Sequence, residues 1–98
     1  MEDISIQEFK EREAKGEALN VLDVREQWEY DEDNIGATLI PLGDLPARHS
    51  EIADWKSQEL IVHCKAGGRG GNAKKYLVSQ GFTNVRNLLG GITAYRES

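Results

Sequence analysis

The sequence predicts a single α/β domain whose mostly parallel sheet is covered by helices on both faces. Short, apolar, β-branched segments alternate along the chain with segments of helical spacing. Strands buried on both faces read as continuous apolar runs, as several of these segments do. The domain is expected to cover residues 1–98, because a chain of 98 residues supports one hydrophobic core and no second domain.

The composition argues against nucleic-acid binding, membrane insertion and secretion. A net charge of −5 argues against a nucleic-acid partner, since phosphate binding needs a basic face. The sequence has no apolar run of about 18 residues that could cross a membrane, and its acidic start, residues 1–5, lacks the features of a signal peptide. A cytoplasmic location is therefore expected.

The single cysteine and two histidines limit metal and redox chemistry. Cys64 has no partner for an internal disulfide, which agrees with a reducing compartment. One cysteine with the separated His49 and His63 does not form a zinc pattern, so neither a metal nor a cofactor is expected. Any second thiol in the chemistry of Cys64 must come from another molecule.

The first helix is predicted to begin after Ser5 and to end near Gly16. Ser5 followed by Glu8 matches a capping box, and a glycine is a frequent end to a helix. Asp3 and Ile4 are expected to form a brief strand before this helix.

Residues 19–24 form the next predicted strand, and residues 26–33 a short helix. Asp23 and Arg25 at the strand end admit a catalytic reading. The favoured reading is structural, with Arg25 paired to Glu29 so that the loop is tied down. Trp28 is expected in the core, with a place in the wall of the active-site mouth as the alternative.

The middle of the chain contributes another strand and helix. Residues 37–42 read as a strand that Pro41 ends, and a helix begins at Leu45 with Pro46 in its first turn. Trp55 is expected to close this unit, and His49 is expected on the surface.

The most informative stretch begins with a buried strand over residues 60–62 and continues through Cys64 into a glycine-rich loop. Residues 72–80 then recur at helical spacing, with Gly81 placed as the C-terminal cap. Cys64 therefore lies where a strand passes into a helix, at the carboxyl edge of the sheet, where open α/β folds bind ligands.

This loop has the character of an anion-binding nest. Four of the six residues from Ala66 to Gly71 are glycine, which lets backbone N–H groups converge on an anion. Those amides, the helix dipole and the cations Lys65 and Arg69 would all favour a thiolate at Cys64. A lone cysteine is otherwise most often a small buried hydrophobe. We predict Cys64 as the nucleophile, with the bound anion held by Lys65, Ala66, Gly67, Gly68, Arg69 and Gly70.

His63 adjoins the nucleophile and raises the possibility of a Cys–His pair. Neighbouring residues of a strand point to opposite faces, so His63 is expected to be directed away from Cys64. Gly70 and Gly71 weaken a helix if they are interior, which suggests that the backbone must approach something closely there.

The end of the chain completes the alternation. Residues 84–88 read as the last strand, Gly90 and Gly91 as a turn, and residues 92–96 as a terminal helix with Tyr95 packed back on the domain.

Several segments together resemble a single-domain rhodanese, the family of thiosulfate and persulfide sulfurtransferases. They occur in the family's order from about residue 19 to 96: Leu22–Tyr30, Ile35–Leu42, Ile61–Cys64, Gly81–Val85 and Leu88–Ile92. The resemblance implies a three-layer fold with a five-stranded sheet and the cysteine loop after the fourth strand.

The length of the loop between Cys64 and Arg69 distinguishes sulfurtransferases from related enzyme classes. Four residues lie between Cys64 and Arg69, as is typical of sulfurtransferases, whereas related phosphatases and arsenate reductases have five. A small phosphatase is therefore disfavoured. The chain departs from the family at Ala66 and Gly70, where serines are frequent, and this puts strong thiosulfate turnover in question. It also departs at residues 33–36, where the family commonly has His-Ile-Pro-Gly, a difference that looks structural.

The resemblance implies a two-step sulfur transfer. Cys64 would take sulfane sulfur from thiosulfate or a persulfide donor, and the resulting persulfide would pass it to cyanide, a thiol or a protein acceptor. Arg69 would brace the loop and supply counter-charge, while Lys65 would meet an anionic donor at the rim. The alternative is a sulfur-carrier or binding module that is loaded only by a partner protein.

Overall fold

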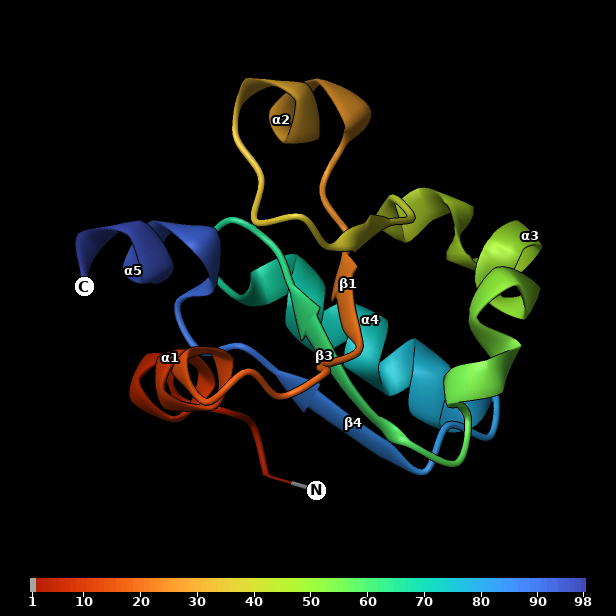
Figure 1. The fold of residues 1–98 in the computed structure, drawn as a ribbon. Coiled ribbons are helices and arrows are strands. Elements are labelled where there is room, and N and C mark those ends of the chain that lie inside the picture. Colours follow the sequence, from red (N-terminus) through yellow and green to blue (C-terminus); the bar gives the residue numbers. More distant parts are fainter. Residues whose placement is uncertain (1) are drawn as a thin grey trace.

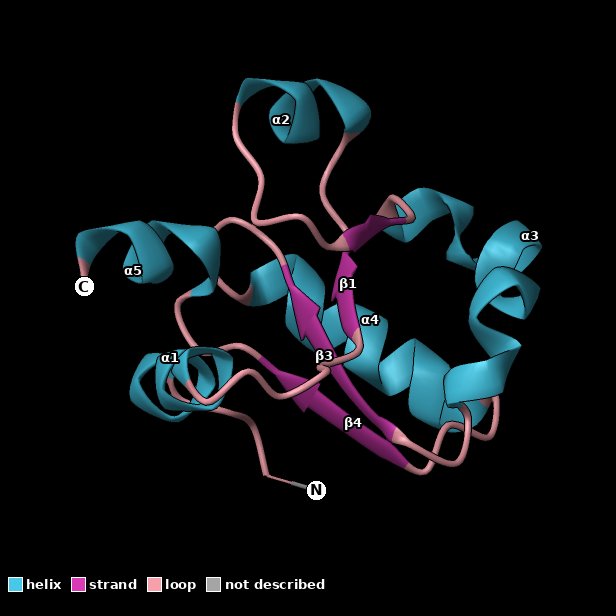
Figure 2. Cartoon of the chain, in the orientation of Figure 1, coloured by secondary structure: helices cyan, strands magenta, loops and turns pink. Residues whose placement is uncertain are grey.

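The computed structural model describes residues 2–98 and contains a sheet of four parallel strands in the order β2-β1-β3-β4. Figures 1 and 2 show the strands in the middle of the molecule with helices around them. The strands are β1 (Val21–Asp23), β2 (Thr38–Leu39), β3 (Glu59–His63) and β4 (Asn84–Asn87).

The predicted fifth strand is reduced to one bridge. Ile4 pairs in parallel with Leu88, through hydrogen bonds from the Ile4 N–H to the Asn87 carbonyl and from the Leu89 N–H to the Ile4 carbonyl. Helix α1 begins only two residues later, which leaves no room for a longer strand. The prediction of five strands is therefore wrong by one, and the cysteine loop follows the third strand, β3.

Helices cover both faces of the sheet, as predicted. Helices α1 and α5 lie on one face, while α3, the 3₁₀ segment η2 and α4 lie on the other; α2 lies beyond the carboxyl end of β1 (Figure 1). The helical segments are α1 (Ile6–Ala14), α2 (Gln27–Glu32), η1 (Leu42–Asp44), α3 (Leu45–Arg48), η2 (His49–Trp55), α4 (Gly68–Ser79) and α5 (Gly91–Glu97). Within residues 2–98, every helix is too short or too polar to span a bilayer.

Two apolar clusters hold these layers to the sheet. The larger one joins Leu22 and Val62 of the sheet to Leu77 of α4. The smaller one joins Ile61 to Phe9 of α1, and Tyr95 of α5 packs edge-to-face on Phe9 with ring centroids 5.9 Å apart. Successive residues of β3 thus serve opposite clusters, as the alternation along a strand requires.

Helix α4 begins at Gly68, four residues before the predicted start at residue 72. Glycines in a sequence read as helix breakers, but Gly67 has a φ of +117° and turns the chain directly into the helix. The helix ends at Ser79 with Gln80 as its C-cap, and Gly81, which was predicted as the cap, follows with a φ of +96°.

The capping box predicted for α1 forms only in part. The Ser5 hydroxyl accepts a hydrogen bond from the Glu8 N–H at 3.1 Å. The Glu8 carboxylate instead accepts from Arg86 of β4 at 2.8 Å, which ties the helix to the sheet edge.

Candidate active site

Cys64 follows β3 and lies at the N-terminus of α4. Its side chain is 1% exposed, and its Sγ accepts a hydrogen bond from the Gly67 N–H at 3.0 Å. Gly67 caps α4, so the sulfur lies at the positive end of the dipole of a helix of 12 residues. An N–H donor and the positive end of a helix dipole are both suited to an anion at this position.

Arg69 is held by Glu29 of α2. Its two terminal nitrogens donate to the two carboxylate oxygens of Glu29, at 2.5 and 2.9 Å. This contact lowers the pKa of Glu29 from 4.5 to about 2 and raises the pKa of Arg69. Arg69 therefore ties the cysteine loop to α2, as a brace of the predicted kind, and remains charged.

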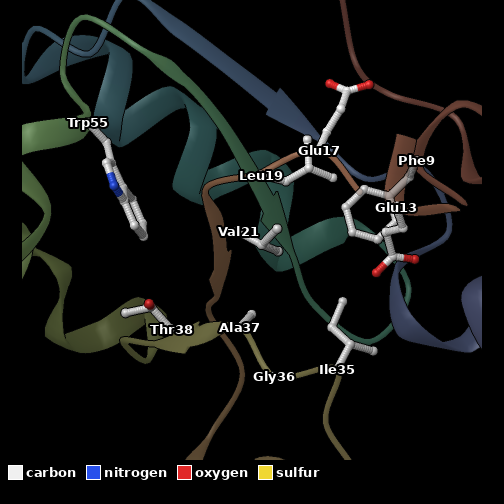
Figure 3. Close-up of a pocket in the computed structure, with 10 residues that line it drawn as sticks. All are labelled: Phe9, Glu13, Glu17, Leu19, Val21, Ile35, Gly36, Ala37, Thr38 and Trp55. Atoms are coloured by element: carbon white, nitrogen blue, oxygen red, sulfur yellow. The ribbon is translucent and has the colours of Figure 1, made fainter. Parts of the chain in front are cut away.

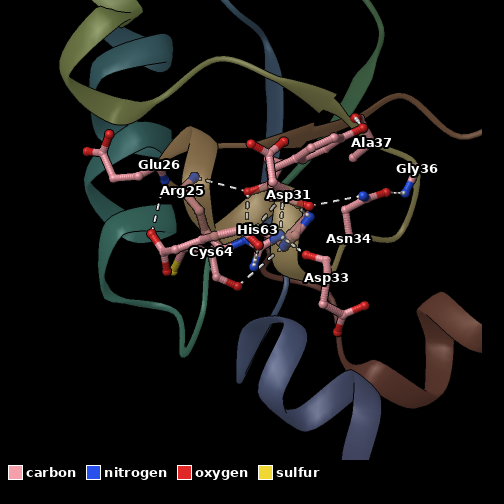
Figure 4. A network of polar contacts seen from close by, with 12 residues as sticks. Arg25, Glu26, Asp31, Asp33, Asn34, Gly36, Ala37, His63 and Cys64 are labelled. Carbon is pink, nitrogen blue, oxygen red and sulfur yellow. Dashed lines mark hydrogen bonds and ion pairs between the residues drawn. The ribbon is translucent and has the colours of Figure 1, made fainter.

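The predicted Arg25–Glu29 ion pair is wrong, because Glu29 pairs with Arg69 and Arg25 pairs with Asp23. The Arg25 guanidinium donates to the Asp23 carboxylate at distances of 2.8 to 3.2 Å, and both side chains are buried. Arg25 also donates to the carbonyl of Asp33 at 2.8 Å, so it holds both ends of the loop and helix after β1 (Figure 4). This is a structural role, which was the favoured reading of Asp23 and Arg25.

His63 is fully buried, and its ring nitrogens lie near oxygens rather than near the sulfur. Nδ1 lies 3.3 Å from the Cys64 carbonyl oxygen, and Nε2 lies 3.5 Å from a carboxylate oxygen of Asp23. Burial lowers the pKa of His63 and favours the neutral ring. This arrangement gives no support to His63 as the base for Cys64.

The N-terminus of α5 fixes the backbone of the loop from the opposite side. The N–H groups of Ile92 and Thr93 donate to the carbonyls of Cys64 and Lys65, at 2.9 and 3.0 Å. Gly91 has a φ of +60°, and a Cβ at this position would clash with the carbonyl oxygens of the same two residues. The Gly90–Gly91 turn predicted from the sequence thus holds the backbone of the cysteine loop in place.

Three residues that shape the site were not assigned to it from the sequence: Glu29, Gly91 and Asn87. Asn87 ends β4 and donates from its side-chain amide to the Gly67 carbonyl at 3.0 Å. A polar residue at the carboxyl end of a buried parallel strand is a signal that would have pointed to it. The partners of Glu29 and Gly91 lie 40 and 27 positions away in sequence, and no local pattern predicts such contacts.

A pocket of about 340 Å³ lies between α2 and α5, beside the start of the loop, and Lys65 and Trp28 line it. Trp28 is 63% exposed, so its predicted place in the core is wrong and the alternative, a wall beside the site, fits better. Lys65 is exposed and forms no ion pair with any residue in 2–98. Ala66 and Gly68 are exposed as well.

A second groove, of about 360 Å³, crosses β1 from Trp55 to Phe9 (Figure 3). Val21 and Ile35 form part of its floor, and no residue of the cysteine loop lines it. It is therefore separate from the candidate site. Residues 2–98 contain no group of three or more histidine, cysteine, aspartate or glutamate side chains placed to hold a metal ion.

The chain is similar to known proteins of one family. The family model described as a rhodanese-like domain matches residues 5–98. Across 92% of the chain, 36% of residues are identical to the putative sulfur carrier protein YrkF of Bacillus subtilis, of which the chain spans only 48%. Across 95% of the chain, 33% are identical to a sulfurtransferase of Allochromatium vinosum, of which it spans 86%.

Solved structures show the same fold. The rhodanese-like domain of an Anabaena protein superposes with a TM-score of 0.87 at 32% identity, covering 97% of this chain and 73% of that one.

Proposed function

The chain belongs to the rhodanese-like family of sulfurtransferases and sulfur carriers, and from this premise we propose that it transfers sulfane sulfur through a persulfide on Cys64. The observation that carries the proposal is the hydrogen bond from the Gly67 N–H to Sγ at the N-terminus of α4. This contact favours the thiolate that the first step needs, so a separate general base is not required.

In the first step the Cys64 thiolate attacks the outer sulfur of thiosulfate or of another sulfane donor. A bond forms between the two sulfurs, the donor's own sulfur–sulfur bond breaks, and sulfite or a thiolate leaves with the electron pair. Lys65 at the rim supports the approach of an anionic donor, because it is exposed and unpaired within the described chain.

In the second step an acceptor attacks the outer sulfur of the persulfide. Cyanide leaves as thiocyanate and a thiol leaves as a persulfide, and in both cases Cys64 returns to the thiolate. Amides of the loop and the charge of Arg69 would stabilise the anionic sulfur between the two steps. No metal or cofactor takes part in this scheme.

A carrier role, with loading only by a partner protein, is the second candidate. Cys64 is 1% exposed, so a donor must be guided to the sulfur, and neither Ala66 nor Gly70 supplies a loop hydroxyl for thiosulfate. The relative YrkF is named a putative sulfur carrier.

Intact-mass measurement after incubation with thiosulfate tests the proposal. We expect a gain of one sulfur atom, about 32 Da, that cyanide removes and that the Cys64→Ser variant does not show. Loading only by a protein persulfide donor would favour the carrier role. Failure of both donors to load Cys64 would overturn sulfur transfer altogether.

A further inference from the structure

We propose that Asn87 is a positioning residue for Cys64, acting through the peptide group that donates to the sulfur. The proposal rests on Cys64 being the reactive group of the proposed function. Asn87 does not touch the sulfur. Its side-chain amide donates to the carbonyl of Gly67, and the N–H of Gly67 donates to Sγ.

The contacts form a short chain from β4 to the nucleophile. The Asn87 side-chain amide donates to the Gly67 carbonyl at 3.0 Å, and the Gly67 N–H donates to Cys64 Sγ at 3.0 Å. Gly67 has no side chain to anchor it, and its φ of +117° lies in a region that only glycine enters easily. Its orientation therefore depends on what its N–H and its carbonyl bind. The carbonyl accepts from the Gly71 N–H of α4 at 3.0 Å, and Asn87 supplies the one side-chain donor to it among the described residues.

Asn87 itself is firmly held. Its backbone N–H donates to the Asp3 carboxylate at 3.0 Å, and its carbonyl accepts from the Ile4 N–H at 3.0 Å. The residue is 6% exposed and lies opposite Val62 in the register of β3 and β4. The carbonyl of Gly67 only accepts hydrogen bonds, which requires the NH₂ end of the amide to face it.

The Oδ1 end of the Asn87 amide explains why position 70 of α4 is a glycine. The Asn87 Oδ1 is buried without a hydrogen-bond partner, and a Cβ placed on Gly70 would collide with it. Burying an unpaired oxygen and keeping a glycine in the first turn of α4 both cost stability. Both are accounted for if the amide must occupy this place to hold Gly67.

The test compares Asn87→Ala and the nearly isosteric Asn87→Asp with Asn84→Ala, a matched change on the same strand away from the loop. For both Asn87 variants we expect alkylation of Cys64 by iodoacetamide at pH 7 to slow by about tenfold or more, because the thiolate is the reactive form and a hydrogen bond to a charged group contributes about that factor. Asn84→Ala should react at the wild-type rate. Far-ultraviolet circular dichroism and thermal melting establish that each variant is folded.

Two further readouts separate positioning from general stability. In ¹⁵N-resolved NMR spectra, the Gly67 amide proton of the native protein should shift strongly as Cys64 ionises, and Asn87→Ala should reduce that shift. Gly70→Ala, which displaces the Asn87 amide, should slow alkylation as much as Asn87→Ala does. The double variant should be no slower than either single variant, because the two act through one contact.

Folded Asn87 variants that alkylate at the wild-type rate and keep the full Gly67 shift would overturn the proposal. Additive effects of Gly70→Ala and Asn87→Ala would also overturn it. Neither readout requires sulfur transfer, so a failure here is distinguishable from a failure of the wild-type protein to form a persulfide.

Discussion

Glu29 and Arg69 form a two-pronged ion pair, with oxygen–nitrogen distances of 2.5 and 2.9 Å, across 40 positions of sequence. The pair joins α2 to the first turn of α4, and so to the loop that holds Cys64. The Glu29 side chain is 10% exposed, and the geometry is bidentate, which makes this contact stronger than an ordinary surface pair.

Replacing Glu29 by Gln should destabilise the protein by about 1–3 kcal/mol at pH 7, because Arg69 loses a charged partner while Arg69 itself stays charged. Urea unfolding followed by circular dichroism measures the loss. Glu51→Gln is the matched control, since Glu51 pairs with Arg48 on the exposed surface and its removal should change stability by less than about 0.5 kcal/mol. Equal losses in the two variants would contradict a special role for the Glu29–Arg69 pair.

The same pair predicts a pH dependence with a definite sign. The pKa of Glu29 is 4.5 ordinarily and about 2 in the folded protein, so the unfolded chain binds more protons between these values. The stabilisation by Glu29 is therefore complete above about pH 4.5 and is lost as the pH falls towards 2. The free energies of unfolding of the wild type and of Glu29→Gln, measured as a function of pH, should converge as the pH falls through this window. A difference that stays constant down to pH 2 would argue against the depressed pKa.

Gly91→Ala should be strongly destabilising, by more than about 2 kcal/mol, because its φ is +60° and an added Cβ would meet the Lys65 carbonyl oxygen at 2.5 Å. Gly43→Ala is the control, since Gly43 has no positive φ and no neighbour within 4 Å of an added Cβ. Thermal melting should show a large loss for the first variant and little change for the second. A fully stable Gly91→Ala protein would mean that α5 does not clamp the loop.

Lys65→Gln should slow loading of Cys64 by thiosulfate by roughly two- to fivefold at low ionic strength, with no loss of stability, because an exposed cation attracts a dianion without bracing the fold. The rate is read as the appearance of the mass adduct. The effect should shrink in high salt, and Lys75→Gln, an exposed lysine on the outer part of α4, should have none. Equal slowing by both substitutions would mean that Lys65 acts only through the net charge of the protein and has no specific role at the loop.

The sequence by itself determined the alternation of strands and helices, the place of Cys64 between β3 and α4, and the family. The alternation and the place of Cys64 follow from local signals, namely apolar periodicity and glycine turns, whereas the family follows from the resemblance of several segments in their order along the chain. The limits of elements were less certain, because Gly68, Gly70 and Gly71 have poor intrinsic helix propensity and still lie within α4. A fifth strand read from Asp3 and Ile4 proved to be one bridge.

Only the tertiary structure decided which residues meet around the cysteine. The sequence predicted the nearby Arg25 as the partner of Glu29, but in the structure Glu29 pairs with the distant Arg69. Trp28 lies on the surface because α2 stands beyond the end of the sheet, where no layer covers it. The contact of Asn87 with Gly67 depends on the register of β4 against β3. Such contacts follow from the packing of whole layers, which local propensity does not encode.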